Sequence, residues 1–277
     1  MTLSVRSIAF ICLALFAGAA AAQKFEPQVG QAGKDVIWVP TPDEVVERML
    51  TMAQVTPQDF VMDLGAGDGK IAIAAAKKFG ARAIGIEYNP DMVKHANANA
   101  QAAGVAGSGR GQAVIRHGDI FQTDFTQATV ITLYLLPALN MKLRPQLLAM
   151  RPGTRVVSHS FTMEDWEADE MSSVDGRRAY FWLVPANVNG SWTLEAGSQR
   201  MEMAFEQTFQ KISGTVNFPP IQAGLREARL RGAAIQFAYV GQDRVRRDFS
   251  GRVTGSKMEG TFRDEKGAEG KWTAARK

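Results

Sequence analysis

The 277-residue chain contains a single cysteine and only three histidines. One cysteine cannot build a disulfide framework or a cysteine-rich zinc site. The histidines, at positions 95, 117 and 159, are too far apart in sequence to suggest a histidine-based metal site, so no metal is expected. Runs of Lys or Arg never exceed two residues, and 32 basic residues face 28 acidic ones. The sequence therefore gives little support to nucleic-acid binding.

The chain also lacks an apolar run of the ~20 residues that a membrane-spanning helix needs. A shorter run at residues 8–16 follows Arg6 and precedes an alanine-rich stretch that ends at Ala22. A charged, an apolar and a small-residue region in this order are typical of a secretory signal peptide. Residues 1–22 are therefore expected to direct export to the periplasm or the medium and to be removed, the alternative being an uncleaved anchor. No stable membrane span is expected after cleavage.

Residues 35–161 alternate strand-like and helix-like segments. Apolar runs predict strands at 60–64, 83–87, 113–120, 129–136 and 155–161. Helical patterns occur at about 42–54, 69–79, 90–102 and 137–150. This alternation predicts a mostly parallel sheet with helices on both faces. Thr41 and Glu44 form a potential capping box for the first helix, and Gly80 is placed to end the second.

After about residue 175 the pattern changes to apolar–polar alternation with glycine turns. The charge changes at the same place, because residues 175–277 carry 17 basic and 11 acidic side chains, and the rest of the chain carries 15 and 17. We therefore expect an α/β domain at 23–174 and a small antiparallel β-rich domain at 175–277, closed or nearly closed. The basic excess of the second domain fits a solvated face or a docking surface for an acidic partner or anionic lipid.

The most informative segment is the glycine-rich turn after the first predicted strand. It reads Asp63-Leu-Gly-Ala-Gly-Asp-Gly, with glycines at 65, 67 and 69. A dinucleotide-binding fingerprint needs glycine where Lys70 stands, and a phosphate-binding Walker loop needs Ser or Thr where Ile71 stands. Both motifs are therefore disfavoured, and the turn predicts close approach of the backbone to another nucleotide-like ligand.

Acidic residues end three successive predicted strands, at Asp63, Glu87 and Asp119. Glu87 follows Asp63 by 24 residues, near the spacing at which a carboxylate accepts hydrogen bonds from ribose hydroxyls. Because the carboxyl ends of neighbouring parallel strands meet at one edge of the sheet, the three carboxylates are expected to converge on one ligand-binding crevice.

With these residues the chain resembles the class I S-adenosylmethionine-dependent methyltransferases, which have a Rossmann-like fold. Three further segments, at 40–42, 132–137 and 156–159, are similar to the small bacterial and mitochondrial lysine methyltransferases related to the ATP synthase c-subunit enzyme. The resemblance covers about residues 36–166 and implies S-adenosylmethionine as cofactor. It implies a protein lysine as the leading acceptor and a small-molecule amine as the runner-up. A non-catalytic exported protein that binds a nucleotide or a partner is the alternative from another class.

The resemblance also implies which residues bind the cofactor. Asp63 would lie near the amino group of the methionine moiety, Glu87 would bind the ribose, and Asp119 would bind the adenine amino group. The other implied cofactor-binding residues are Thr41, Gly65, Gly67, Gly69 and Phe121.

Tyr134 and His159 are the candidate catalytic residues, although each could instead have only a structural role. Tyr134 stands where methyltransferases acting on adenine or glutamine usually have an Asn/Asp-Pro-Pro-aromatic tetrad, which this chain lacks. It could pack on an incoming amine or orient it. His159, at the tip of the fifth predicted strand, is a possible general base. A base or desolvation is needed because a lysine amine, with a pKa near 10.4, is almost fully protonated at neutral pH.

We expect signal cleavage close to the bond between Ala22 and Gln23, because small residues precede it in the pattern that signal peptidases require. N-terminal sequencing of the protein recovered from cells measures this directly. A cytosolic product that retains Met1 would contradict the expectation.

Overall fold

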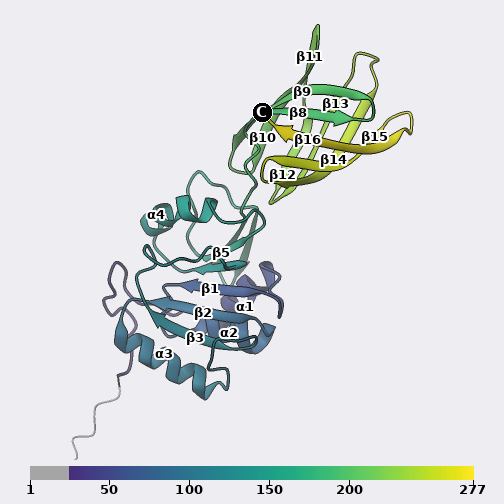
Figure 1. Cartoon of the computed structure of the whole chain (residues 1–277). Coiled ribbons are helices and arrows are strands. Elements are labelled where there is room, and N and C mark those ends of the chain that lie inside the picture. Colours follow the sequence, from purple (N-terminus) through teal and green to yellow (C-terminus); the bar gives the residue numbers. More distant parts are fainter. Residues whose placement is uncertain (1–24) are drawn as a thin grey trace, which may run out of the picture.

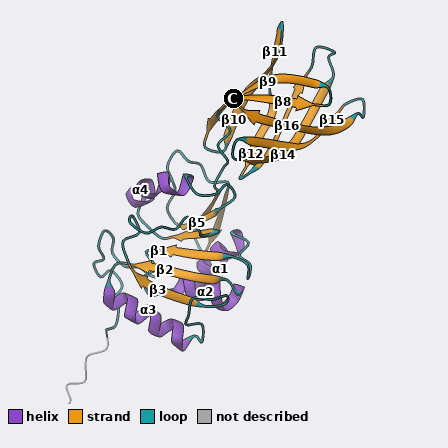
Figure 2. Cartoon of the chain, viewed as in Figure 1, coloured by secondary structure: helices purple, strands orange, loops and turns teal. Residues whose placement is uncertain are grey.

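The structure is a computed structural model that describes residues 25–277, so the expected signal peptide lies outside the described residues. Two β-sheets form two separate units along the chain (Figure 1). Helices occur only in the first of these units, and the second consists of strands and turns (Figure 2). Within residues 25–277, no helix has both the length and the apolar character needed to cross a membrane.

The first unit confirms the α/β expectation. Its elements are α1 (Asp43–Met52), β1 (Phe60–Leu64), α2 (Lys70–Phe79), β2 (Arg82–Glu87), α3 (Pro90–Ala102), β3 (Ala113–His117), β4 (Val130–Leu133), α4 (Pro137–Leu148), β5 (Arg155–His159), β6 (Glu170–Val174) and β7 (Arg177–Leu183). The sheet order is β3-β2-β1-β4-β5-β7-β6. Strands β1 to β5 are parallel, and the β6–β7 hairpin adds an antiparallel edge next to β5.

Helices cover both faces of this sheet. Successive strand residues point to opposite sides, and apolar residues on each side pack against the helices there. In β4, Val130 packs in the core that contains α1 and α2, whereas Ile131 packs in the core that contains α4. Both side chains are fully buried. The continuous apolar runs seen in the sequence are therefore strands buried on two faces, as is usual for parallel sheets.

The start of α1 differs from the capping box that the sequence suggests. Pro42 is the N-cap residue, and no side chain caps the helix. The hydroxyl of Thr41 instead lies 3.1 Å from Nδ1 of His159, at the end of β5. The capping-box prediction is wrong because this long-range contact orients the threonine away from the helix. Gly80, in contrast, ends α2 with a left-handed φ of 69°, as expected.

The second unit is a single curved antiparallel sheet. Its strands are β8 (Gly190–Ala196), β9 (Gln199–Thr208), β10 (Lys211–Phe218), β11 (Ile221–Gly224), β12 (Arg226–Arg231), β13 (Ala234–Val240), β14 (Arg246–Thr254), β15 (Lys257–Asp264) and β16 (Glu269–Arg276). The sheet order, β11-β10-β9-β8-β16-β15-β14-β13-β12, places β11 and β12 at opposite ends. These two strands follow each other in the chain, and Leu225 between them donates its amide to Gly214 of β10 at 2.8 Å. The sheet is therefore nearly closed, around a core that includes the fully buried Trp192 and Trp272.

The first sheet continues beyond the boundary expected at residues 174–175. That position falls in the turn between β6 and β7, and both strands belong to the first sheet, which ends at Leu183. The two strands of this hairpin are antiparallel and no helix lies between them, as in the second unit, which is why the sequence places the change of domain too early.

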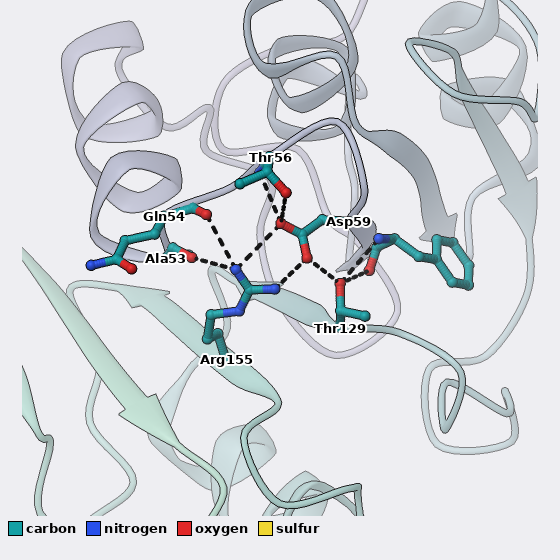
Figure 3. Close-up of polar contacts among 7 residues, drawn as sticks. Ala53, Gln54, Thr56, Asp59, Thr129 and Arg155 are labelled. Carbon is teal, nitrogen blue, oxygen red and sulfur yellow. Dashed lines mark hydrogen bonds and ion pairs between the residues drawn. The ribbon is translucent and has the colours of Figure 1, made fainter. Parts of the chain in front are cut away.

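A charged network fixes the amino ends of three strands to the end of α1 (Figure 3). Asp59, before β1, pairs with the guanidinium of Arg155 in β5 and accepts a 2.7 Å hydrogen bond from Thr129, before β4. Nη1 of Arg155 also donates to the carbonyl oxygens of Ala53, at 2.9 Å, and Gln54, at 3.2 Å. Burial alone raises the pKa of Asp59, but hydrogen bonds led by that of Arg155 outweigh it and hold the pKa below its ordinary value.

Replacing Arg155 with Met would leave the Asp59 carboxylate buried without its cation, and we expect a loss of about 3 kcal/mol in the free energy of unfolding at pH 7. Because the folded-state pKa of Asp59 is lowered, this stabilisation is present above the ordinary aspartate pKa and is lost as the pH falls through the lowered value. Denaturant titrations of both proteins at pH 7 and near pH 3 measure the difference. An undiminished difference in acid would contradict this account.

Candidate functional site

A cavity of about 320 Å³ lies at the carboxyl ends of β1, β2 and β4. The glycine turn between β1 and α2 forms one of its walls. The segment that precedes α1, residues 31–41, forms another and is called the strap below. A short antiparallel pairing of Ala32 with Ile37 holds the strap in a hairpin, and the amide of Trp38 donates a 2.9 Å hydrogen bond to the carbonyl oxygen of Gln31.

The glycine turn approaches the cavity with backbone that only glycine accommodates easily. Gly67 has a φ of 52°, and a Cβ there would lie 2.5 Å from Nε1 of Trp38 in the strap. Gly69 has a φ of 81° and precedes the first residue of α2; a Cβ there would lie 2.9 Å from Ile115. Gly65 and Gly67 line the cavity, whereas Gly69 is needed for packing of the turn against the protein interior.

Glu87, at the end of β2, lines the cavity and braces the glycine turn. Its Oε2 accepts a 2.9 Å hydrogen bond from the amide of Gly67, and its Oε1 accepts a 2.8 Å bond from the amide of Asn89. These two bonds fix the carboxylate between the turn that follows β1 and the backbone that follows β2. The sequence predicts a ribose acceptor at this position.

Asp63, at the tip of β1, is almost fully buried, with 2% exposure. Its Oδ1 accepts a 2.7 Å hydrogen bond from Thr132 of β4, but its Oδ2 is buried and has no hydrogen-bond partner in the described part of the chain. Burial raises the pKa of Asp63 to about 7, against the hydrogen bond from Thr132, and the nearby charges of Asp68 and Glu87 raise it further. A cationic group in the cavity would supply the missing partner.

Asp119 lies on the opposite side of the cavity and contacts the strap. Its Oδ2 pairs with Nζ of Lys34 at 2.7 Å, and its Oδ1 accepts a 2.9 Å bond from the amide of Phe121. The hydrogen bond from Lys34 holds the pKa of Asp119 below its ordinary value. Lys34 Nζ also lies 4.7 Å from the ring centre of Tyr88, so the strap closes this end of the cavity through one lysine.

Aromatic rings form the wall beyond β4 and β5. Tyr134 lines the cavity; its ring centre is 4.0 Å from that of His159 and 6.1 Å from that of Phe161, which also lines it. His159 lies behind Tyr134, is 2% exposed and does not line the cavity. Burial, followed by the positive charge of Arg177, lowers the pKa of His159 to about 4. An imidazole with so low a pKa is a weak base, and this one has no access to the cavity, so it is poorly suited to take a proton from a substrate.

The cavity brings together most of the residues predicted from the sequence. Those that line it are Thr41, Asp63, Gly65, Gly67, Glu87, Asp119 and Tyr134. Gly69, Phe121 and His159 lie outside its lining. Phe121 instead packs under the ammonium of Lys142, which is 3.8 Å from its ring centre, so its side chain supports the turn after β3 rather than the cavity.

Comparisons with known proteins agree with this geometry. Residues 63–170 match the model of the ANTKMT methyltransferase domain. A crystal structure from Salinibacter ruber, described as an RNA methyltransferase in complex with S-adenosyl-L-homocysteine, is 49% identical with a TM-score of 0.52, covering 54% of this chain and 96% of that one. A protein-lysine N-methyltransferase of Saccharolobus islandicus is 44% identical over 142 residues, which are 50% of this chain and 86% of the relative.

This chain belongs to the methyltransferase family that includes the Saccharolobus islandicus enzyme. The ATP synthase c-subunit lysine N-methyltransferase of Mus musculus is 32% identical over 48% of this chain. The chain spans about half the length of that mouse enzyme, 51%. The match to the family model lies within the first unit, and the expected S-adenosylmethionine-dependent methyltransferase fold is confirmed.

Two contacts of this methyltransferase site were not predicted from the sequence. Thr132 is a polar residue in the otherwise apolar β4, and its register opposite Asp63 shows why a hydroxyl stands there. That break in the apolar run was a usable signal. Lys34, in contrast, reaches Asp119 across 85 residues of sequence from an irregular segment, and no local pattern indicates the pair.

Replacing Asp63 with Asn tests whether the methyltransferase carries an uncompensated buried charge. The folded-state pKa of about 7 exceeds that of the unfolded chain, so the charge destabilises the fold increasingly as the pH rises from about 4 to 7. We expect the variant to be more stable by roughly 1–3 kcal/mol at pH 8, with a higher melting temperature, and to gain little near pH 4. Thermal melts at both pH values measure this; an equal gain at both would contradict it.

Proposed function

We propose that this methyltransferase transfers the methyl group of S-adenosylmethionine to the side-chain amine of a protein lysine. The observation that carries the proposal is the 44% identity to a relative named as a protein-lysine N-methyltransferase, over 86% of that relative's length. Two mouse relatives are also named for lysines, one in the ATP synthase c-subunit and one in the adenine nucleotide translocase.

The residues of the cavity suit this cofactor. The unpartnered Oδ2 of Asp63 matches the ammonium group of the methionine moiety, since a buried carboxylate oxygen needs a donor. Glu87 is an acceptor for ribose hydroxyls, and Asp119 is an acceptor for the adenine amino group once Lys34 releases it. When bound, the cofactor supplies an electrophilic methyl group on its sulfonium.

The acceptor amine would approach from the wall formed by Tyr134, Leu136 and Phe161. These mainly apolar side chains remove water from the amine, which lowers its pKa and favours the neutral form that reacts. Of the charged residues that line the cavity, five are acidic and two basic, so the cavity attracts a lysine side chain from solution. They are Asp35, Asp63, Asp68, Glu87 and Asp119 against Lys34 and Lys70.

An RNA acceptor is the second candidate, because the 49% identical Salinibacter ruber protein is described as an RNA methyltransferase. The chain has no run of more than two basic residues to follow a phosphate backbone, and this favours the protein acceptor. A small-molecule amine is the remaining acceptor class. We also propose export, on the order of charged, apolar and small residues in the first 22 positions.

Methyl transfer from isotope-labelled S-adenosylmethionine decides among the three acceptors. The full chain is incubated with proteins of the source cell, with total RNA and with small amines, and the products are digested and analysed by mass spectrometry. We expect label on lysine in a protein and none above background in RNA or small amines. Label confined to RNA nucleotides or to a small amine would contradict the lysine proposal.

Replacement of Glu87 with Ala tests whether this side chain binds the ribose of the cofactor. Each lost charge-assisted hydrogen bond costs roughly 1.5–3 kcal/mol, so calorimetric titration with S-adenosylhomocysteine should show about ten- to a hundredfold weaker binding. Asp68→Ala is the control, because Asp68 lines the same cavity and should have a smaller effect. Since Glu87 also accepts the amide of Gly67, thermal melts must show that the variant is folded. Unchanged affinity in a folded Glu87→Ala protein would remove the ribose assignment.

A further inference from the structure

The turn between β9 and β10 of the second unit has an unusual residue at its tip. Thr208 pairs with Lys211, so Phe209 and Gln210 form a two-residue turn. Tight turns of this length favour Asn-Gly or Asp-Gly, because these residues tolerate a positive φ. Phe209 has a φ of 53°, which a bulky side chain rarely adopts. Such a conformation persists only where the surroundings hold it in place.

The side chains that contact the ring of Phe209 belong to the first unit. Its ring stacks on Trp166, with centres 6.1 Å apart and planes 22° apart, and the guanidinium of Arg144 lies 5.3 Å from its ring centre. Trp166 is fully buried in the segment between β5 and β6, residues 160–169, called the β5–β6 connection below. Arg144 comes from α4.

Polar contacts fix the same turn from both sides. Nε2 of Gln210 donates to the carbonyl oxygen of Glu167 at 2.8 Å, and Lys211 pairs with the Glu167 carboxylate at 2.7 Å. Within the second unit, Nε2 of Gln207 donates to the carbonyl oxygens of Phe209, at 2.6 Å, and of Ala186, at 2.8 Å. The turn is therefore tied both to the β5–β6 connection and to the link between the two sheets.

The β5–β6 connection carries part of the cavity wall. Phe161, near its beginning, lines the cavity and stacks on Tyr134. The backbone that follows is held by α4, because Asn140 donates to the carbonyl oxygen of Thr162 at 3.1 Å and Arg144 donates to that of Met163 at 3.0 Å. Arg144 thus contacts Phe209 with its guanidinium and fixes the backbone two residues from Phe161.

The second unit does not itself reach the cavity. Among the described residues, none after Phe161 lines it. The chain enters the second unit after Leu183, which pairs with Arg155 at the amino end of β5, whereas the cavity lies at the carboxyl ends of the strands. Figure 1 shows the second unit attached on the β5 side of the first sheet. The contacts of Phe209, Gln210 and Lys211 with the β5–β6 connection and with α4 therefore join the second unit to the elements that carry Phe161.

We propose that the second unit positions the acceptor wall of the methyl-transfer cavity through Phe209, which clamps the β5–β6 connection against α4. Phe209 is a positioning residue, since it acts on Phe161 through Trp166 and Arg144. Naming this wall the acceptor wall rests on the proposed function, whereas the clamp itself is a property of the fold. The cofactor side, with Asp63, Glu87 and Asp119, lies on other strands and is not held by this turn.

Hydrogen–deuterium exchange of the full chain, followed by mass spectrometry, tests the clamp without reference to activity. Phe209→Ala removes both the stacking and the cation–π contact, so peptides covering residues 160–169 should exchange about tenfold faster. Phe209→Tyr retains the ring and should exchange like the unmodified protein. Phe218→Ala is the matched control, because Phe218 lies at the other end of β10 and packs on Tyr239, 5.9 Å away, inside the second unit.

Binding and turnover then test the link to the acceptor wall. In the Phe209→Ala protein we expect the Kd for S-adenosylhomocysteine to stay within about twofold, while kcat/KM for the lysine acceptor falls about tenfold and Phe209→Tyr restores it. Unchanged exchange at 160–169, or equally faster exchange in the Phe218→Ala control, would overturn the clamp. Faster exchange with unchanged kcat/KM would overturn its role at the acceptor wall. If no acceptor is methylated at all, the proposed function fails, but the exchange result still decides the clamp.

Discussion

The buried carboxylate of Asp63 is the constraint on which the cavity depends. It stands at the tip of the central strand β1, between β2 and β4, with one oxygen bonded to Thr132 and the other without a partner among the described residues. Burial raises the pKa of Asp63 to about 7, so the charged form of this side chain destabilises the fold at neutral pH. The left-handed glycine turn and the carboxylate of Glu87 that braces it line the same cavity as Asp63, where a ligand with a cationic group would supply the missing partner.

The two ends of the cavity are built by different means. The end that we assign to the cofactor consists of residues at or just after strand ends, whose positions follow from the parallel sheet itself. The acceptor wall includes Phe161, on a ten-residue connection between β5 and β6 that has no sheet neighbours of its own over most of its length. Contacts with α4 and with the turn at Phe209 give this connection a defined place. We propose on this basis that the second unit acts on a cavity it does not reach, through this connection.

The sequence was sufficient for those parts of the fold that have a local signal. The periodicity of the first five strands and the first four helices, and the three acids at strand ends, predicted the sheet and one wall of the cavity. The remaining features depend on contacts between distant segments. Thr41 bonds with His159 instead of capping α1, Lys34 reaches Asp119, and the β6–β7 hairpin joins the first sheet despite its pattern. No window of sequence contains both partners of any of these contacts.

A crystal structure of the full chain with S-adenosylhomocysteine would test the central claim, that the three strand-end acids form the cofactor site, most directly. In that structure we expect the ribose hydroxyls to donate to Glu87 and the amino group to lie against Asp63. We also expect the adenine amino group to take the place of Lys34 at Asp119. A ligand bound in this cavity without contact to Glu87 and Asp63, or bound elsewhere, would contradict it.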